Sequence, residues 1–234
     1  MRSIRAWTDA LAHLFFPHNC AACGTELSQR NLCICTRCQL QLPETGFAAL
    51  AGNAVEKAFY GRLPLIAAGS AFYFHKNAKL QRLIHLLKYS GRSDVGLQLG
   101  RLMGMQLAEA VRFNHIDTLI PLPLYPNKER KRGYNQANIL CKGMAEILKL
   151  RVDEHAIIRK RPTETQTKKG RGERWQNVQQ SFEVQDQACL ENKNILLVDD
   201  VMTTGASLDA CGQALRSVSG IGISVFTLAY ASDI

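Results

Sequence analysis

The fold of this chain depends on one stretch, Asn194-Ile-Leu-Leu-Val-Asp-Asp-Val-Met-Thr-Thr-Gly-Ala-Ser207. Its continuous aliphatic run, Ile195 to Val198, is typical of a strand buried on both faces of a parallel sheet. Two carboxylates follow, Asp199 and Asp200, at the end of the strand where open α/β sheets bind their ligands. The stretch therefore predicts a buried strand that ends in a ligand-binding turn.

The residues after the acidic pair predict a site for a phosphorylated sugar. A turn, Thr203 to Ser207, leads into an amphipathic run, Leu208 to Val218, that predicts a helix. The first backbone amides of a helix lack partners within it and, together with the helix dipole, favour a phosphate. Two ionised carboxylates are pure acceptors and suit the two hydroxyl donors of a sugar diol. The alternative is an ordinary buried strand, a chance pair of aspartates and an N-capped helix.

Two other nucleotide-binding motifs are absent from the sequence. Nucleoside triphosphatases also contain runs such as Leu-Leu-Val-Asp-Asp, but they need a Gly-x-x-x-x-Gly-Lys-Ser/Thr loop, and the chain has no Gly-Lys pair. The chain also has no Gly-x-Gly-x-x-Gly run for a dinucleotide. Both classes of protein are excluded.

The stretch resembles the signature loop of type I phosphoribosyltransferases, which bind phosphoribosyl pyrophosphate (PRPP). The resemblance implies that the acidic pair holds the ribose hydroxyls, that the turn cradles the 5′-phosphate, and that magnesium accompanies the pyrophosphate. The residues that it places in the PRPP site are Asp199, Asp200, Val201, Met202, Thr203, Thr204, Gly205, Ala206 and Ser207. No residue stands out as a general base.

Five cysteines near the amino terminus predict a structural zinc site. Cys20-Ala-Ala-Cys23 and Cys35-Thr-Arg-Cys38 are two Cys-x-x-Cys knuckles about a dozen residues apart, which is the spacing of a tetrahedral site. We expect these four thiolates to bind Zn²⁺ and Cys33 to be a spare. A disulfide cluster is the alternative, but five cysteines cannot all pair and no export signal precedes them. The isolated cysteines, Cys141, Cys189 and Cys211, are expected to be core or bystander residues.

The positive charge of the chain is concentrated in one block. The formal net charge is +9, and Lys128 to Arg174 contains 14 Lys and Arg against 6 Asp and Glu, so 14 − 6 = +8 lies in that block. A single basic block beside a phosphate site points to anionic ligands, either pyrophosphate or nucleic acid. Arg130 and Arg132 are expected to border the pyrophosphate. Two aromatics within the block, Tyr134 and Trp175, are candidates for stacking on bases.

The alternation of strand and helix patterns from Leu65 onward predicts a mostly parallel, doubly wound α/β sheet with helices on both faces. We expect it to follow an amphipathic leader helix (1–17), the cysteine module (18–43) and a partly helical connector (44–64). The predicted strands are 65–74, 117–124, 156–159, 195–198 and 222–230, and the further predicted helices are 78–88, from Ser93 or Asp94 as cap to about 112, and about 135–150.

Two further features of the sequence bear on location and on the active site. Asp9 and His13 interrupt the apolar stretch that a signal peptide needs, and no apolar run is long enough to span a bilayer, so a cytoplasmic protein is expected. The polar segment Thr163 to Gln180 is long for a connector. It is expected to be a flap over the pyrophosphate, with Gln166, Arg174 and Asn177 as its reaching groups, or else a surface loop.

Several motifs together resemble the ComF family, a group with a type I phosphoribosyltransferase domain and an amino-terminal cysteine module. They are Arg130-Lys-Arg-Gly-Tyr-Asn-Gln-Ala137, Arg161-Pro-Thr-Glu-Thr-Gln166, Glu173-Arg174-x-x-Asn177 and Phe182, in the order of the family. Met202, where the family often has an aromatic residue, and the basic run Lys168-Lys169-Gly170 depart from the pattern. The resemblance implies handling of single-stranded DNA during DNA uptake and natural transformation, with competence-machinery proteins as possible partners. The alternative is a metabolic phosphoribosyltransferase that releases pyrophosphate from PRPP on transfer to an unidentified acceptor.

Overall fold

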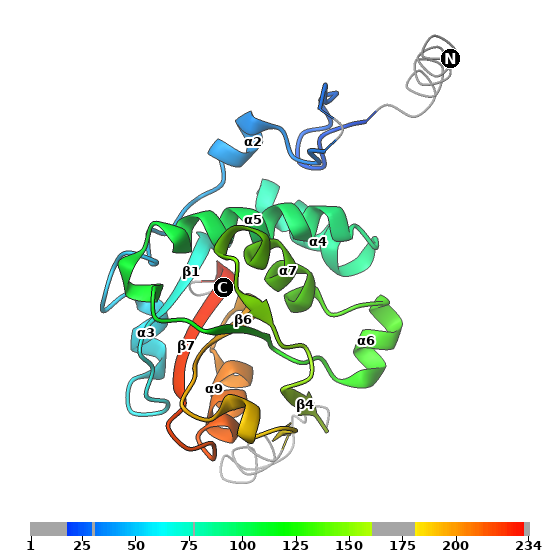
Figure 1. The fold of residues 1–234 in the computed structure, drawn as a ribbon. Coiled ribbons are helices and arrows are strands. Elements are labelled where there is room, and N and C mark those ends of the chain that lie inside the picture. Colours follow the sequence, from blue (N-terminus) through cyan, green and yellow to red (C-terminus); the bar gives the residue numbers. More distant parts are fainter. Residues whose placement is uncertain (1–17, 30, 77, 161–180, 232–234) are drawn as a thin grey trace, which may run out of the picture.

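A five-stranded parallel sheet forms the centre of the molecule (Figure 1). The computed structural model describes residues 18–29, 31–76, 78–160 and 181–231. The order of the strands across the sheet is β1-β7-β6-β2-β3, and all neighbours are parallel. The strands are β1 (Ala68–Tyr73), β2 (Thr118–Pro121), β3 (Arg151–Val152), β6 (Asn194–Met202) and β7 (Gly222–Tyr230). The aliphatic run of β6 is fully buried in the middle of this sheet, as its sequence predicts.

Helices cover both faces of the sheet, so the predicted doubly wound α/β architecture is confirmed. One apolar layer contains α4 (Lys79–Tyr89), α5 (Ser93–Ala108) and α7 (Gln136–Leu148), together with buried residues of the cysteine module. The other contains α3 (Ala54–Phe59) and α9 (Ala206–Leu215). The remaining elements are α2 (Thr36–Leu40), α6 (Pro126–Arg132) and the 3-10 turns η1 (Val111–Phe113) and η2 (Ala188–Leu190).

The strand order places a topological switch point between β2 and β6. The chain leaves β2 towards β3 at one edge of the sheet, and it leaves β6 towards β7 on the other side. The connections that follow these two adjacent strands therefore diverge and leave a crevice at their carboxyl ends, where ligands of open α/β sheets bind.

The chain between β3 and β6 differs from the sequence expectation. A short strand, β4 (Ile157–Arg159), pairs antiparallel with β5 (Phe182–Val184) in a separate two-stranded ribbon. The predicted strand at 156–159 exists, but it lies outside the main sheet. The predicted flap and the predicted leader helix fall on residues 161–180 and 1–17, outside the described residues.

Two helix starts also differ from the expectation. Ser93 and Asp94 are the first residues of α5 rather than its cap, and the cap residue Arg92 makes no side-chain capping bond. The basic residues after β2, for which the sequence predicts no helix, form the short helix α6, which begins at a proline and ends at Gly133. Proline suits the first turn of a helix because it lacks an N–H, and Gly133 adopts φ 84°, which ends the helix at low cost.

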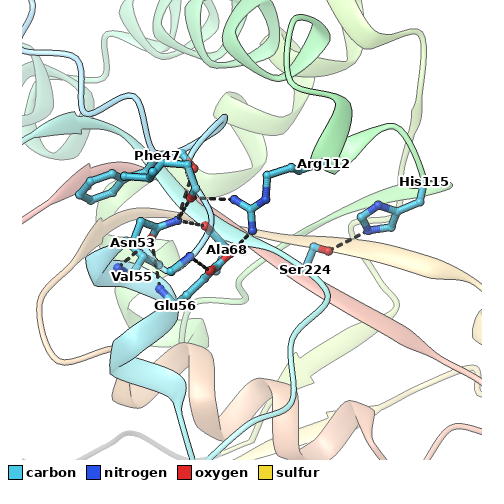
Figure 2. Close-up of polar contacts among 10 residues, drawn as sticks. Phe47, Asn53, Val55, Glu56, Ala68, Arg112, His115 and Ser224 are labelled. Carbon is cyan, nitrogen blue, oxygen red and sulfur yellow. Dashed lines mark hydrogen bonds and ion pairs between the residues drawn. The ribbon is translucent and has the colours of Figure 1, made fainter.

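The connector is tied to the sheet by a polar network (Figure 2). The side chain of Asn53 accepts from the amides of Val55 and Glu56, which begins α3, and donates to the carbonyl oxygen of Ala68 at 2.7 Å. The carboxylate of Glu56 pairs with the guanidinium of Arg112, and its Oε1 accepts from the amide of Ala68 at 3.2 Å. These contacts hold α3 against the start of β1, so the connector is an ordered part of the domain.

A second polar contact lies at the amino end of β7. His115 contacts the buried hydroxyl of Ser224 at 3.0 Å (Figure 2).

Within the described part of the chain, none of the helices has both the length and the apolarity needed to cross a lipid bilayer.

Candidate functional site

The acidic pair belongs to the last part of β6 and projects beyond the neighbouring strand. The pairing of β2 with β6 stops at Pro121 opposite Val198, and the amide of Leu122 donates just beyond it to the carbonyl oxygen of Val198 at 2.8 Å. The pairing of β6 with β7 continues to Met202 opposite Tyr230. Asp199 and Asp200 are therefore fixed by β7 on one side and open towards the crevice on the other.

Each aspartate has a cationic neighbour from a different part of the fold. Lys88 Nζ, at the end of α4, lies 3.0 Å from Asp200 Oδ2, and both side chains are largely buried. Burial and the adjacent charge of Asp200 raise the pKa of Asp199 to about 7, although the positive charges of Lys88 and Arg159 oppose the shift. Burial in turn lowers the pKa of Arg159 in the ribbon. The pair is thus a compact anionic site whose charge depends on pH near neutrality.

The turn after the pair forms a small cavity at the start of α9. Gly205 adopts φ 72°, and a Cβ there would lie 3.0 Å from Met202 Cε and Phe59 Cζ, so glycine is required. Among the residues that the structure describes, no side chain caps the first amides of α9. The cavity, of about 90 Å³, is lined by Asp199, Val201, Met202, Thr203, Thr204, Gly205, Ala206, Ser207 and Leu208. The loop residues that the sequence predicts thus share one cavity, apart from Asp200, which is held by Lys88.

Arg62 supports this turn through an ion pair and a hydrogen bond. Its guanidinium donates to Asp209 Oδ2 at 2.8 Å and to the carbonyl oxygen of Thr204 at 3.4 Å. Asp209 is 3% exposed and lies in the first turn of α9, where a carboxylate also suits the helix dipole. The ion pair therefore fixes the start of α9 relative to α3.

A basic helix borders the crevice on the β2 side. After α6, Asn135 caps α7 by accepting from the amide of Ala137, and its Nδ2 donates to the carbonyl oxygen of Leu122, at the end of β2. Tyr134 donates from its hydroxyl to the carbonyl oxygen of Leu87 in α4, at 2.5 Å. The Arg-Gly-Tyr-Asn segment thus ends one helix, starts the next and joins both to the rim of the sheet.

The predicted basic residues lie partly on this rim. Arg132 donates to Gln136 and its Cζ lies 5.7 Å from the ring centroid of Tyr89, whereas Arg130 donates to Asn127 within α6. Arg174 lies outside the described residues. Sequence reasoning missed Lys88, Arg159 and Arg62, because nothing local marks these three cations as partners of aspartates far along the chain.

The four predicted cysteine ligands form one cluster. The sulfur atoms of Cys20, Cys23, Cys35 and Cys38 all lie within 4.8 Å of one another. The amide of Cys35 donates to Cys20 Sγ at 3.3 Å, which links the two knuckles. The contact of Cys23 with the hydroxyl of Thr25 lowers the pKa of the Cys23 thiol to about 6. A set of four converging thiols suits a tetrahedral metal ion.

Cys33 lies apart from the cluster and is held by α5. A single buried side chain, Gln98, accepts from the amides of Cys33 and Ile34 at 2.8 and 3.0 Å and from Cys33 Sγ at 3.1 Å. Gln98 Nε2 also donates to the carbonyl oxygen of Ile34. Burial raises the pKa of Cys33 to about 12, and it raises that of the cluster thiol Cys38 equally, so the contacts with Gln98 rather than the acidity set Cys33 apart. The other three cysteines follow the expectation: Cys141 and Cys211 are buried in the core, and Cys189 is an exposed bystander.

The parallel sheet with its switch point, the acidic pair and the glycine turn define a doubly wound α/β protein that carries a cluster of four cysteines. Among known proteins, the chain is 27% identical to Competence protein F of Haemophilus influenzae, over 93% of this chain and 99% of that protein. It is 31% identical to DNA utilization protein YhgH of Escherichia coli O6:H1, over 64% of this chain and 66% of that protein, slightly less than two thirds of its length. It is 37% identical to Competence protein ComFC of Bacillus subtilis, over 47% of this chain and 43% of that protein.

The chain is thus similar to two competence proteins and to a DNA utilization protein. No protein-family model matches it. Solved structures with some similarity include adenine phosphoribosyltransferase from Leishmania tarentolae, with a TM-score of 0.39 and 11% identity over 81% of this chain and 94% of that one. Another is a hypoxanthine phosphoribosyltransferase from Staphylococcus aureus, with a TM-score of 0.36 and 14% identity over 61% of this chain and 69% of that one.

The contacts of Gln98 predict that its loss loosens the cysteine module. Gln98→Leu keeps the approximate volume but leaves the amides of Cys33 and Ile34 without their acceptor, which should lower the free energy of unfolding by about 2–4 kcal/mol. Urea unfolding measures the loss, and the alkylation rate of the cysteines, which should rise, measures the loosening. Gln106→Leu, the same change at a half-buried position of the same helix, is the matched control and should change either quantity little. Equal unfolding free energies for the two variants would contradict this role of Gln98.

Proposed function

We propose that this protein binds PRPP at the end of β6. The observation that carries the proposal is the cavity in which Asp199 lies beside the glycine turn at the uncapped start of α9. The amides and hydroxyls of the turn suit the 5′-phosphate, and the carboxylates of Asp199 and Asp200 suit the ribose diol. The position of both groups at the switch point of the sheet supports the same ligand.

The cations around the crevice support a pyrophosphate group on that ligand. Lys88 and Arg159 lie near the acidic pair, and α6 adds Arg130 and Arg132 on the β2 side. Magnesium would accompany the pyrophosphate and neutralise its charge. In a transferase, orientation and charge neutralisation of the leaving group supply most of the rate enhancement, so a general base is not needed to explain the site.

We further propose that the protein handles single-stranded DNA during DNA uptake, in the cytoplasm. The names of the relatives, two competence proteins and a DNA utilization protein, support this role, as does the net charge of +9. The alternative is a metabolic transferase. Release of pyrophosphate from PRPP with a base from a panel of acceptors, and no binding of single-stranded DNA, would favour that alternative.

PRPP with Mg²⁺ should stabilise the fold by mass action, by about 2.7 kcal/mol at a hundredfold excess over its Kd. A thermal-shift titration measures this effect. The double variant Asp199→Asn/Asp200→Asn should lose the shift, because its amides keep the shape of the site but accept the diol more weakly. Glu191→Gln, which neutralises an exposed carboxylate elsewhere, is the control and should respond like the wild type. A normal response of the double variant would place the site elsewhere.

The affinity for PRPP should increase from pH 6 to pH 8. The pKa of Asp199 is raised to about 7, so this side chain is largely protonated at pH 6 and cannot accept both hydroxyls, and it becomes a full acceptor as the pH rises above 7. Calorimetric titrations across this range measure the trend. The phosphate groups of PRPP also titrate in this range. The variant Asp199→Asn should keep the pH dependence that comes from the ligand and lose the part that comes from Asp199. The same pH profile in the variant and the wild type would contradict the assignment to Asp199.

We also propose that the cysteine cluster binds one Zn²⁺ as a closed structural site. The protein purified without chelator should contain one zinc per chain, and Cys33→Ser should keep it, because Cys33 is bound to Gln98 outside the cluster. Cys35→Ser should lose most of it. Strong chelation should increase hydrogen exchange before about Pro43 and leave the sheet protected, because thiolate ligation is coupled to local folding. Metal analysis that finds no zinc in the wild type would end this proposal.

A further inference from the structure

We infer that the last turn of α4 and helix α6 form a surface for single-stranded nucleic acid, with Tyr89 as its base-stacking platform. The inference rests on the DNA-handling part of the proposed function and names the surface that would carry it. The side chain of Tyr89 is 67% exposed, and Arg132 Cζ lies 5.7 Å from its ring centroid. An exposed aromatic face next to a guanidinium is the combination on which single-stranded bases stack.

Helix α6 provides the positive charge for the phosphate backbone. Lys128, Arg130 and Lys131 are exposed beside Arg132, and Glu129 is the single acidic residue of the helix. None of the residues of α6 is buried, and beyond its first proline it has no apolar side chain. A membrane surface is therefore the less suitable partner, since the helix has nothing to insert among acyl chains. Four cations next to one exposed ring suit a short single strand.

The aromatic residue that the sequence suggests within this block is engaged elsewhere. Tyr134 packs partly buried against the core, and its hydroxyl is bound to the carbonyl oxygen of Leu87. Tyr89 lies outside the basic block in the sequence, and only the fold brings it against α6. His85, one turn earlier on α4, lies with its ring centroid 4.9 Å from that of Tyr89, with the two rings tilted at 48° to each other.

The same turn of α4 also touches the acidic pair. Three consecutive residues contact a turn, a strand and a helix: Leu87 accepts from Tyr134 between α6 and α7, Lys88 pairs with Asp200 of β6, and Tyr89 meets Arg132 of α6. A ligand that engages Asp200 would therefore compete with Lys88 and loosen the turn that presents Tyr89. The sugar-phosphate site and the nucleic-acid surface should be thermodynamically linked through Lys88, and such a linkage is reciprocal.

The stacking role can be tested with a fluorescein-labelled oligothymidylate. Tyr89→Leu should weaken its binding roughly tenfold, whereas Tyr89→Phe should bind like the wild type, because the ring and not the hydroxyl stacks. Tyr60→Leu is the matched control, since Tyr60 is 64% exposed but lies beside α3. Inorganic polyphosphate is the second probe, and it should bind Tyr89→Leu and the wild type equally because it carries charge and no bases.

The outcomes of this test separate the claims. Equal oligothymidylate affinities for Tyr89→Leu and the wild type, or an equal loss in Tyr60→Leu, would overturn the assignment of Tyr89. An equal loss of polyphosphate binding in Tyr89→Leu would show that the substitution acts through charge or folding, which also overturns stacking. A wild-type protein that responds to PRPP but binds no oligothymidylate would remove the DNA-handling role together with this surface.

The link through Lys88 is tested by repeating the oligothymidylate titration with saturating PRPP and Mg²⁺. In the wild type the affinity should fall about fivefold or more. In Lys88→Met, at a PRPP concentration that the variant's own thermal-shift titration shows to be saturating, this factor should approach one, because Asp200 no longer holds the turn. An unchanged factor in Lys88→Met would show that the two ligands merely repel each other, and it would overturn the link. A factor of one in a PRPP-bound wild type would also overturn it. A wild type that does not bind PRPP at all would instead defeat the proposed PRPP site.

Discussion

Two adjacent carboxylates at the end of a buried strand set the central constraint on this fold. Asp199 and Asp200 cannot both be ionised there unless cations lie close by, because desolvation and mutual repulsion disfavour the charges. Lys88 comes from α4 on one face of the sheet, and Arg159 comes from the β4–β5 ribbon. Removal of one partner from a largely buried ion pair typically costs about 3–5 kcal/mol. The site therefore depends on elements that are far apart in the sequence.

The sequence predicts the parts of the fold whose burial is periodic or continuous. The central strand β6, the final strand β7 and the amphipathic helices α4 and α7 lie within a few residues of their predicted bounds, because core packing follows such patterns. The strands β3 and β5 contain two and three residues, too few for any pattern, and their pairing is decided by distant partners. Helix α6 was missed because it has no apolar face, and it depends on Gly133 and Tyr134 for its place.

The predictable part of the site is likewise the part that is local in the sequence. The turn from Asp199 to Ser207 is continuous in the chain, so its strand, turn and helix start reveal the site without a structure. The residues that hold it come from elsewhere: Arg62 meets Asp209 across 147 positions, and Gln98 reaches Cys33 across 65. An arginine or a glutamine can occupy many surface positions, so its residue type does not reveal its partner. Only the packing of the helices brings Arg62 to Asp209 and Gln98 to Cys33. Sequence reasoning therefore finds the groups that face a ligand more readily than those that position them.

Helix α5 connects the cysteine module to the rim of the sheet. Gln98 holds the segment between the knuckles, and on another side of α5 Gly100 packs against Gly143 of α7 so closely that a Cβ at either position would meet backbone atoms. Asn135, the cap residue of α7, is bound to the end of β2 and lies three residues after the last residue of α6. Such close packing transmits displacements because the interior has little free volume. The order of the cysteine module thus bears on the position of α6 through the two helices α5 and α7, and this gives a structural cluster a physical route to the function of the rim.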